Sequence, residues 1–251
     1  MDDIFTIYAH RGSSAFYPEN TLLSFSKAVQ QGANGIELDV QLTKDNHVVV
    51  FHDVSLHRIT GKKGQIGDYT LKELRRMDVG RWKNQRFAGI KIPTLEQVFN
   101  KVMQKDILLN IELKNFFAMK NGLENRVIEL IKQYELGEKI VISTFNPLSL
   151  QILQESHCPS PVALLYFGHL RSPWEYAKEY NCTYVHPPLQ EVDEKMLSLC
   201  RANDLKVIPY HVNTQKDIAK MIRLGTDGII TSQPKTAHNL LFSTRTGRKK
   251  S

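Results

Sequence analysis

A chain of 251 residues with 41% hydrophobic and 24% charged residues has the composition of a globular protein and is long enough for one large domain. The formal net charge is +7, but the last seven residues contain four basic side chains, Arg245, Arg248, Lys249 and Lys250, so the rest carries only +3. No aromatic residue alternates with these basic ones, and no apolar run approaches about 20 residues, which argues against a nucleic-acid-binding protein and an integral membrane protein.

The first predicted unit is a strand followed by a helix. An apolar run over 4–9 predicts a buried strand that ends at His10. The helix is predicted to begin after Asn20, a residue type favoured as an N-cap, and to end at Gly32.

A hairpin is predicted next. Apolar and polar residues alternate over 36–41, which predicts a strand, and residues 45–46 are of types that favour a two-residue turn. The returning strand would then cover 47–52. Such a turn places Asp39 directly opposite His52, with both side chains on one face.

The remaining chain alternates between helices and strands. Residues 54–94 interrupt this alternation, with one short helical run over 71–77, and predict an insertion above the main body that either controls substrate access or has no role. Thr94 then caps a helix with one apolar face. The predicted strands that follow are 107–113, 140–144, 162–166, 183–186, 206–210 and 228–231, and the predicted helices are 123–135, 147–155, 173–180, 191–203, 214–224 and a short one from Pro234.

Eight parallel strands remain if the returning arm of the hairpin is set aside. Eight strand–helix units in about 250 residues favour an α/β TIM (β/α)8 barrel, with a small insertion after the second strand and its hairpin. We therefore predict one domain over 1–242, including the insertion 54–94, and a basic, disordered tail over 243–251.

Polar residues stand where three of these strands end, which is the active-site edge of a barrel. Glu37 and Asp39 are two residues apart and share a face, and Glu112 ends another strand. Three carboxylates without cysteine ligands suit one hard divalent cation, Mg²⁺ or Ca²⁺. The alternative is a salt-bridge network in which Arg11 and Lys114 neutralise the carboxylates, but so many buried carboxylates would be costly without a metal.

Four further residues complete a site for phosphoryl transfer. Arg11 and Lys114 supply positive charge for a phosphate, Arg11 as a two-pronged donor and Lys114 as a point charge. His10 and His52 are the groups that can move protons near neutral pH. Because His52 is predicted to lie beside a metal ligand, it is our candidate general base, and His10 is the candidate general acid.

The order of these motifs resembles the signature of the glycerophosphodiester phosphodiesterases. The resemblance runs across nearly the whole chain. This sequence differs from the family pattern at two places: Tyr210-His211 stand where the family often has Trp-Thr, and Ser232 stands where Asp is usual. The matching motifs are His10-Arg11-Gly12, Pro18-Glu19-Asn20-Thr21, Glu37-x-Asp39, Thr43-Lys44-Asp45, His52-Asp53, Glu112-x-Lys114, Phe145-Asn146-Pro147, Val212-Asn213 and Asp227-Gly228-Ile229-Ile230-Thr231.

The resemblance implies a TIM barrel that hydrolyses glycerophosphodiesters to glycerol 3-phosphate and an alcohol. It also implies metal ligation by Glu37, Asp39 and Glu112, acid–base catalysis by His10 and His52, and phosphate contacts from Arg11 and Lys114. The expected partner is a small-molecule glycerophosphodiester, with no nucleic acid. His186 and His211 also end predicted strands and are candidates to line the pocket.

Two alternatives to this function stay open. A lysophospholipase D acting on lipids is one, for which Phe16, Tyr17, Phe116 and Phe117 are the suggestive apolar residues. A non-catalytic phosphate-binding barrel is the other. Three cysteines without CxxC spacing and an N-terminal apolar run too short for a signal peptide predict a cytoplasmic protein with reduced thiols.

Overall fold

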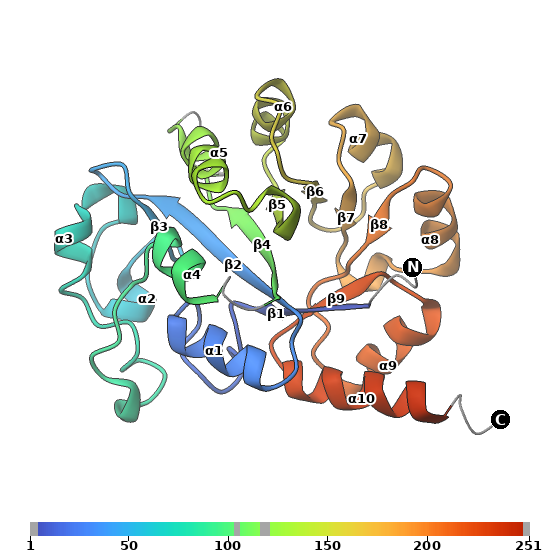
Figure 1. The fold of residues 1–251 in the computed structure, drawn as a ribbon, viewed down its shortest axis with the longest axis horizontal. Helices are drawn as coiled ribbons and strands as arrows, with labels where there is room; N and C mark the ends of the chain where they lie inside the picture. Colours follow the sequence, from blue (N-terminus) through green and yellow to red (C-terminus); the bar gives the residue numbers. More distant parts are fainter. Residues whose placement is uncertain (1–4, 103–105, 116–120, 248–251) are drawn as a thin grey trace.

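The computed structural model describes residues 5–102, 106–115 and 121–247 and has a parallel barrel at its centre (Figure 1). Neighbouring strands follow the order β8-β7-β6-β5-β4-β2-β1-β9, all parallel. Their bounds are β1 (Thr6–His10), β2 (Gly35–Leu42), β4 (Leu108–Leu113), β5 (Ile140–Thr144), β6 (Val162–Leu165), β7 (Tyr184–His186), β8 (Lys206–Val207) and β9 (Gly228–Thr231). The predicted TIM barrel is confirmed.

The seam between β8 and β9 closes the barrel through single backbone hydrogen bonds. Asp227 N donates to Val207 O at 3.0 Å, and Ile230 N donates to Pro209 O at 2.9 Å. The ladder there is short because β8 ends at Val207, three residues earlier than the sequence predicted. The barrel is therefore nearly closed rather than evenly paired all round.

Strand β3 (Val48–Val50) runs antiparallel to β2 and is not a barrel strand, as predicted. Its register differs from the prediction by one residue, because Val40 pairs with Val50 and Asp39 is therefore opposite Phe51 rather than His52. The cause is the turn, which has three residues, 44–46, instead of two. Thr43 N donates to His47 O at 2.9 Å, and the Thr43 hydroxyl accepts from His47 N at 2.9 Å, so these two residues close the loop.

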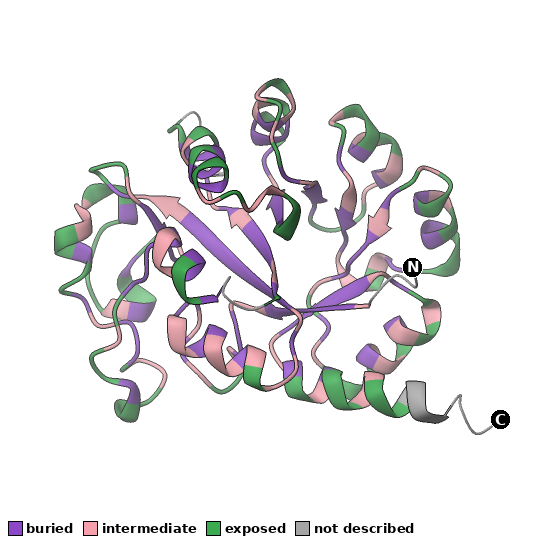
Figure 2. Cartoon of the chain, in the orientation of Figure 1, coloured by how far each residue is buried: buried purple, intermediate pink, exposed green. Residues whose placement is uncertain are grey.

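Helices surround the barrel, and each turns its apolar face toward the strands. Figure 2 shows buried residues on the strands and on the inner sides of the helices, with exposed residues outside. The helices are α1 (Leu22–Gln30), α4 (Leu95–Val102), α5 (Leu123–Gln133), α6 (Pro147–Glu155), α7 (Pro173–Glu179), α8 (Glu194–Arg201), α9 (Gln215–Leu224) and α10 (Pro234–Gly247), with 3₁₀ turns at Gly137–Lys139 and Leu189–Glu191. None of the helices in the described ranges is long and apolar enough to cross a membrane.

Two helix ends differ from the prediction. Thr21, not Asn20, caps α1, because the Thr21 hydroxyl accepts from Ser24 N while Asn20 takes a left-handed backbone with φ of 55°. Helix α10 continues to Gly247, so the expected disordered tail is wrong for 243–247. No proline or glycine interrupts this helix before Gly247, and Ala237 on it is fully buried. Residues 248–251, like Phe116 and Phe117, lie outside the described ranges.

The insertion 54–94 forms a small module with a core of its own. It contains α2 (His57–Thr60), α3 (Leu71–Leu74) and 3₁₀ turns at Ile66–Asp68 and Gln85–Phe87. The predicted helical run over 71–77 is thus shorter. A separate buried cluster holds the module together, made of Val49, Phe51, Leu56, Ile59, Ile66, Leu74, Met77, Val79 and Ile92.

This module lies against the loops at the carboxyl ends of β1 and β2. Lys44 N donates to Tyr69 O at 2.9 Å, and Lys83 Nζ donates to Ser14 O at 2.8 Å. Residues 54–94 contain ten Lys or Arg against three Asp or Glu, a net charge of +7. The excess positive charge therefore belongs to the insertion as well as to the last residues, and the remainder of the chain is net negative.

Candidate active site

A cavity of about 90 Å³ opens at the carboxyl ends of the barrel strands. Six of the seven site residues predicted from the sequence line it, and the seventh, Asp39, lies in contact with them. The lining residues are His10, Arg11, Glu37, His52, Asn110, Glu112, Lys114, Phe145, Leu165, Phe167, Tyr210, His211 and Ile230.

Three carboxylates meet at one end of this cavity. Glu37 and Asp39 project from β2, and Glu112 projects from the neighbouring strand β4, where it is the register partner of Asp39. One oxygen of each lies within 4.8 Å of the others. Burial and the neighbouring carboxylates raise the pKa of Glu37 well above its ordinary value, and burial and Asp39 raise the pKa of Glu112.

Asp39 is held as an anion among donors. Burial alone would raise its pKa, but Arg11, His52 and Lys114 together hold the pKa of Asp39 below its ordinary value. Asn20 Nδ2 donates to Asp39 Oδ2 at 2.8 Å, which is the role of Asn20 in place of the predicted helix cap. Asp39 Oδ1 is buried and accepts no hydrogen bond from the described residues. Its only ion-pair partner among the described residues is Lys114 Nζ, at 3.9 Å. A carboxylate oxygen without a hydrogen bond and two neighbouring acids whose ionisation is suppressed are what a hard divalent cation would relieve, so this donor set fits such a cation.

The two predicted phosphate-binding cations flank the carboxylates. Arg11 follows β1 with a left-handed φ of 53°, and its backbone N–H donates to Glu37 Oε2 at 2.8 Å. Its side chain lies 3.3 Å from Asp39 Oδ2 at Nε and 2.9 Å from Glu19 Oε1 at Nη1. Lys114 Nζ lies 2.8 Å from Glu112 Oε1. Lys114 Nζ also lies 3.9 Å from Asp39 Oδ1, so each of the two cations stands at the cavity wall paired with two carboxylates.

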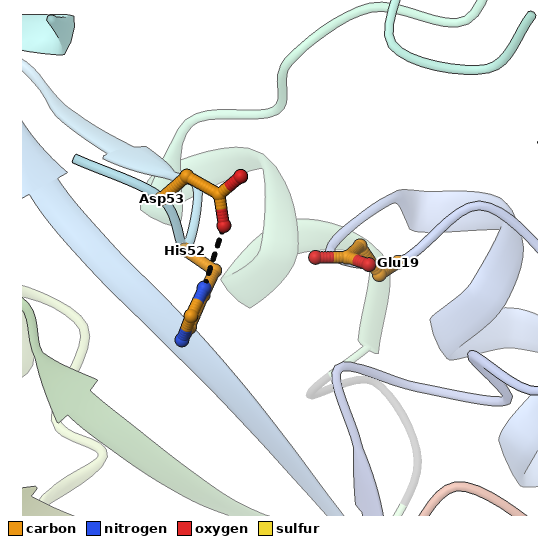
Figure 3. Close-up of side chains that lie close together, drawn as sticks. All are labelled: Glu19, His52 and Asp53. Atoms are coloured by element: carbon orange, nitrogen blue, oxygen red, sulfur yellow. Dashed lines mark hydrogen bonds and ion pairs between the residues drawn. The ribbon is translucent and has the colours of Figure 1, made fainter. Parts of the chain in front are cut away.

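His52 reaches the cavity although the predicted register was wrong. The Gln41 side-chain amide donates to Phe51 O at 2.8 Å and to Asp53 O at 2.9 Å, which fixes the path of the chain beyond β3. His52 Nδ1 is 2.8 Å from Asp53 Oδ1, and its second ring nitrogen points away from Asp53 (Figure 3). Burial opposes the ionisation of Asp53, but hydrogen bonds from His52 and Arg58 hold the pKa of Asp53 well below its ordinary value. An ionised carboxylate only accepts, so Nδ1 carries the hydrogen.

His10 lies on the other side of the cavity, between a hydroxyl and a third histidine. Its Nδ1 is 3.2 Å from Ser232 Oγ, and its Nε2 is 2.9 Å from His211 Nε2. Burial first, and then the charge of Arg11, lower the pKa of His10 well below its ordinary value. Burial likewise lowers the pKa of His211 to about 4. Both positions where the sequence departs from the family pattern, His211 and Ser232, thus contact the same catalytic candidate.

The opposite wall of the cavity is aromatic. The rings of Phe145 and Phe167 stack with centroids 3.9 Å apart and an interplanar angle of 6°, and Phe167 is 71% exposed. Tyr210 meets Phe145 edge-on, and its hydroxyl donates to Tyr166 O at 2.6 Å. The cavity therefore has a charged end and an apolar end.

His186, the other strand-end histidine proposed from the sequence, does not line this cavity. It is fully buried on β7, and neither ring nitrogen has a hydrogen-bond partner among the described residues. Burial lowers the pKa of His186 to about 3.

Replacing His186 by Met should therefore make the protein more resistant to acid. A histidine whose folded pKa is depressed contributes stability that is present above its unfolded pKa of about 6.5 and is lost as the pH falls toward the folded pKa near 3. Thermal unfolding measured between pH 7 and pH 4 should show a smaller fall in Tm for His186→Met than for the parent. His57→Gln, at an exposed position, is the matched control, and an equal fall in all three proteins would contradict the prediction.

Four polar residues around the site have roles that the sequence did not reveal: Glu19, Asn20, Asp53 and Arg58. Glu19 and Asp53 lie close enough together with His52 to form a second possible metal-binding group (Figure 3). Their carboxylates are already bound, however, by the guanidinium of Arg58, which lies 2.7 Å from Glu19 Oε1 and 2.6 Å from Asp53 Oδ2. The sequence motifs that contain Glu19 and Asp53 could be recognised. The role of Arg58 could not, because its contact with Glu19 joins residues 39 positions apart.

Known proteins resemble this chain over nearly its whole length. Residues 10–236 match the model of the glycerophosphoryl diester phosphodiesterase family. A glycerophosphodiester phosphodiesterase of Caldanaerobacter subterraneus subsp. tengcongensis is 40% identical over 235 residues, which is 94% of this chain and 97% of that protein. A phosphodiesterase structure from Oleispira antarctica, in complex with the product sn-glycerol-3-phosphate, has a TM-score of 0.85 at 30% identity and covers 94% of this chain and 96% of the other.

A second solved structure agrees with the first. The glycerophosphodiester phosphodiesterase from Thermotoga maritima has a TM-score of 0.74 at 29% identity, covering 98% of this chain and all of that one. This chain belongs to the glycerophosphoryl diester phosphodiesterase family.

Proposed function

We propose that this protein hydrolyses glycerophosphodiesters to sn-glycerol 3-phosphate and an alcohol, using one divalent cation and two histidines. The observation that carries the proposal is the convergence of three carboxylates, two cations and two histidines on one cavity at the active-site edge of the barrel. The related Oleispira antarctica enzyme, whose structure holds sn-glycerol-3-phosphate as product, supports the choice of product.

The cation would be Mg²⁺ or Ca²⁺, held by Glu37, Asp39 and Glu112. When bound, it would offset negative charge on the phosphoryl oxygens and on the attacking oxygen. Arg11 and Lys114 bind the remaining phosphoryl charge and orient the diester.

Each histidine has a separate task in this proposal. His52 accepts the proton of the attacking oxygen, from water or from the glycerol 2-hydroxyl, and Asp53 stabilises the imidazolium that forms. The attacking oxygen forms a bond to phosphorus as the bond from phosphorus to the alcohol oxygen breaks, and His10 donates a proton to that oxygen. Burial lowers the pKa of His10 most, and the charges of Arg11 and Lys114 lower it further. A bound diester would offset the charge of these two cations and so favour the protonated acid.

Incubation with glycerophosphocholine should release glycerol 3-phosphate and choline, and excess chelator should stop the release. The reaction is followed by coupled detection of glycerol 3-phosphate with Mg²⁺ or Ca²⁺ added back after chelation. Binding without turnover under all these conditions would instead favour a phosphate-binding barrel.

The stacked Phe145–Phe167 pair, of which Phe167 is exposed, favours a second candidate, a lysophospholipase D that accepts an acyl chain at the apolar end of the cavity. A parallel assay with lysophosphatidylcholine tests it. Faster release of choline from the lysolipid than from glycerophosphocholine would favour the lipid-directed activity. A Phe167→Ser variant that loses activity only on the lysolipid would assign the acyl chain to this wall.

A further inference from the structure

Arg58 connects the insertion to the catalytic apparatus. It belongs to α2, and its guanidinium lies between two carboxylates from separate loops. Nε is 2.6 Å from Asp53 Oδ2 and Nη2 is 2.9 Å from Asp53 Oδ1, a two-pronged contact. Nη2 is also 2.7 Å from Glu19 Oε1. The ring of Trp82, also from the insertion, lies 5.2 Å from the guanidinium carbon.

Each of these carboxylates holds one residue of the candidate site. Asp53 Oδ1 accepts from His52 Nδ1 at 2.8 Å, and Glu19 Oε1 accepts from Arg11 Nη1 at 2.9 Å. Figure 3 shows Glu19 reaching from the loop before α1 toward the segment that carries His52 and Asp53. Arg58 is therefore linked through Asp53 to the candidate general base His52. It is linked through Glu19 to the guanidinium of Arg11, a candidate phosphate-binding group.

The geometry of this contact needs an arginine. The planar guanidinium engages both oxygens of Asp53 at once, which fixes the rotation of that carboxylate and hence the orientation of the His52 ring. It also separates two carboxylates that would otherwise repel each other. Lysine could neutralise one of them but could not hold the Asp53 plane, because an ammonium group is a point charge.

We propose that Arg58 is a positioning residue: through Asp53 it holds His52 with its proton on Nδ1, and through Glu19 it holds Arg11 against the phosphate site. The insertion is then part of the catalytic apparatus, in addition to any part in substrate access. This inference rests on the proposed function for its kinetic consequences, although the position of the His52 proton can be observed without turnover.

Arg58→Ala should lower kcat for glycerophosphocholine by about 100-fold, because a misplaced catalytic group costs on that order, while KM changes by a few-fold. Arg58→Lys should recover little of this loss, and added guanidinium chloride should restore part of the activity of Arg58→Ala. The matched control is Arg86→Ala, because Arg86 is an exposed arginine of the same insertion that packs on Phe87 and has no carboxylate partner among the described residues. This control should keep the parental kcat.

Two further measurements separate positioning from a merely structural role. Asp53→Asn should lose about as much kcat as Arg58→Ala, and the double variant should lose little more, because Arg58 acts on His52 through Asp53. In ¹⁵N spectra of the imidazole, His52 should be protonated at Nδ1 in the parent and in Arg86→Ala, and should become a mixture of tautomers in Arg58→Ala.

Equal kcat values for Arg58→Ala and Arg86→Ala would overturn the proposal. An Arg58→Ala protein whose His52 keeps its Nδ1 proton would also overturn it. A parent protein that does not hydrolyse glycerophosphocholine would contradict the proposed function instead. In that case the ¹⁵N spectra alone decide whether Arg58 holds His52.

Discussion

Replacing Glu112 by Gln should remove metal-dependent turnover and, at the same time, stabilise the metal-free protein near neutral pH. The activity is lost because one of three oxygen ligands becomes neutral, and a bound cation contributes several kcal/mol to transition-state stabilisation, so kcat/KM should fall by about 100-fold or more. The stability is gained because three closely spaced carboxylates, two of them buried, repel one another when no cation lies between them.

The gain in stability of the metal-free variant follows from the raised pKa of Glu112. A carboxyl group whose folded pKa lies above its unfolded value of about 4.5 contributes stability that is complete below pH 4.5. That contribution is lost as the pH rises through the folded pKa. A neutral amide does not titrate, so the metal-free Glu112→Gln protein should lose less stability than the parent between pH 4.5 and pH 8.

Two measurements check this prediction. Hydrolysis is titrated with Mg²⁺ and with Ca²⁺, and Tm is recorded in chelator as a function of pH. Glu124→Gln is the matched control, because Glu124 is buried but accepts hydrogen bonds from Asn115 and Ser149 that a glutamine oxygen can also accept. Full activity of Glu112→Gln, or of the parent in excess chelator, would show that the three carboxylates are structural.

Removing His10 should affect substrates according to their leaving groups, whereas removing His52 should not. A general acid contributes typically 10²–10⁴-fold, and only when the departing oxygen needs a proton. Nitrophenolate leaves readily as an anion, whereas the alkoxide of choline needs a proton to leave. His10→Ala should therefore lose far more activity on the choline ester than on the nitrophenyl ester, and His52→Ala should lose heavily on both.

The structure provides a control for this comparison. His211 forms a hydrogen bond with His10 and, within the described ranges, none with His52 or Asp53. His211→Ala should therefore resemble a milder form of His10→Ala rather than His52→Ala. The activities are measured on both esters at saturating substrate. A larger loss on the nitrophenyl ester for His10→Ala would exchange the two roles, and equal losses throughout would show that neither histidine is a simple acid.

The barrel and the convergence of the candidate site residues could be predicted because they depend on local patterns. Strands β5 and β9 and helix α6 begin and end at the predicted residues, since each is a buried apolar run or a capped amphipathic helix with clear turn residues beside it. Glu37 and Glu112 could be found for a related reason. Polar side chains at the ends of buried parallel strands are costly, and barrels collect such ends at one edge.

The errors concern contacts that depend on side chains distant in sequence or on turn details. The one-residue change of hairpin register follows from Thr43, whose hydroxyl closes a three-residue loop where residue types at 45–46 fitted a two-residue turn. His52 still reaches the cavity because Gln41 holds the chain beyond β3. Arg58 could not be assigned at all, because the irregular path of the insertion brings it to Glu19 without any periodic pattern in the sequence.

The position of the basic insertion has a consequence for the rate at which substrate is captured. Its net charge of +7 lies against the loops at the mouth of the barrel, while the remainder of the chain without the four basic residues near its end is net negative. A phosphodiester anion diffusing toward the molecule is therefore drawn to this face, and the association rate constant rises above that of an uncharged surface. Dissolved ions screen exposed charges over about 10 Å at 0.1 M. Added salt should accordingly lower the rate of association with substrate, and hence kcat/KM. It should leave kcat, measured at saturating substrate, largely unchanged.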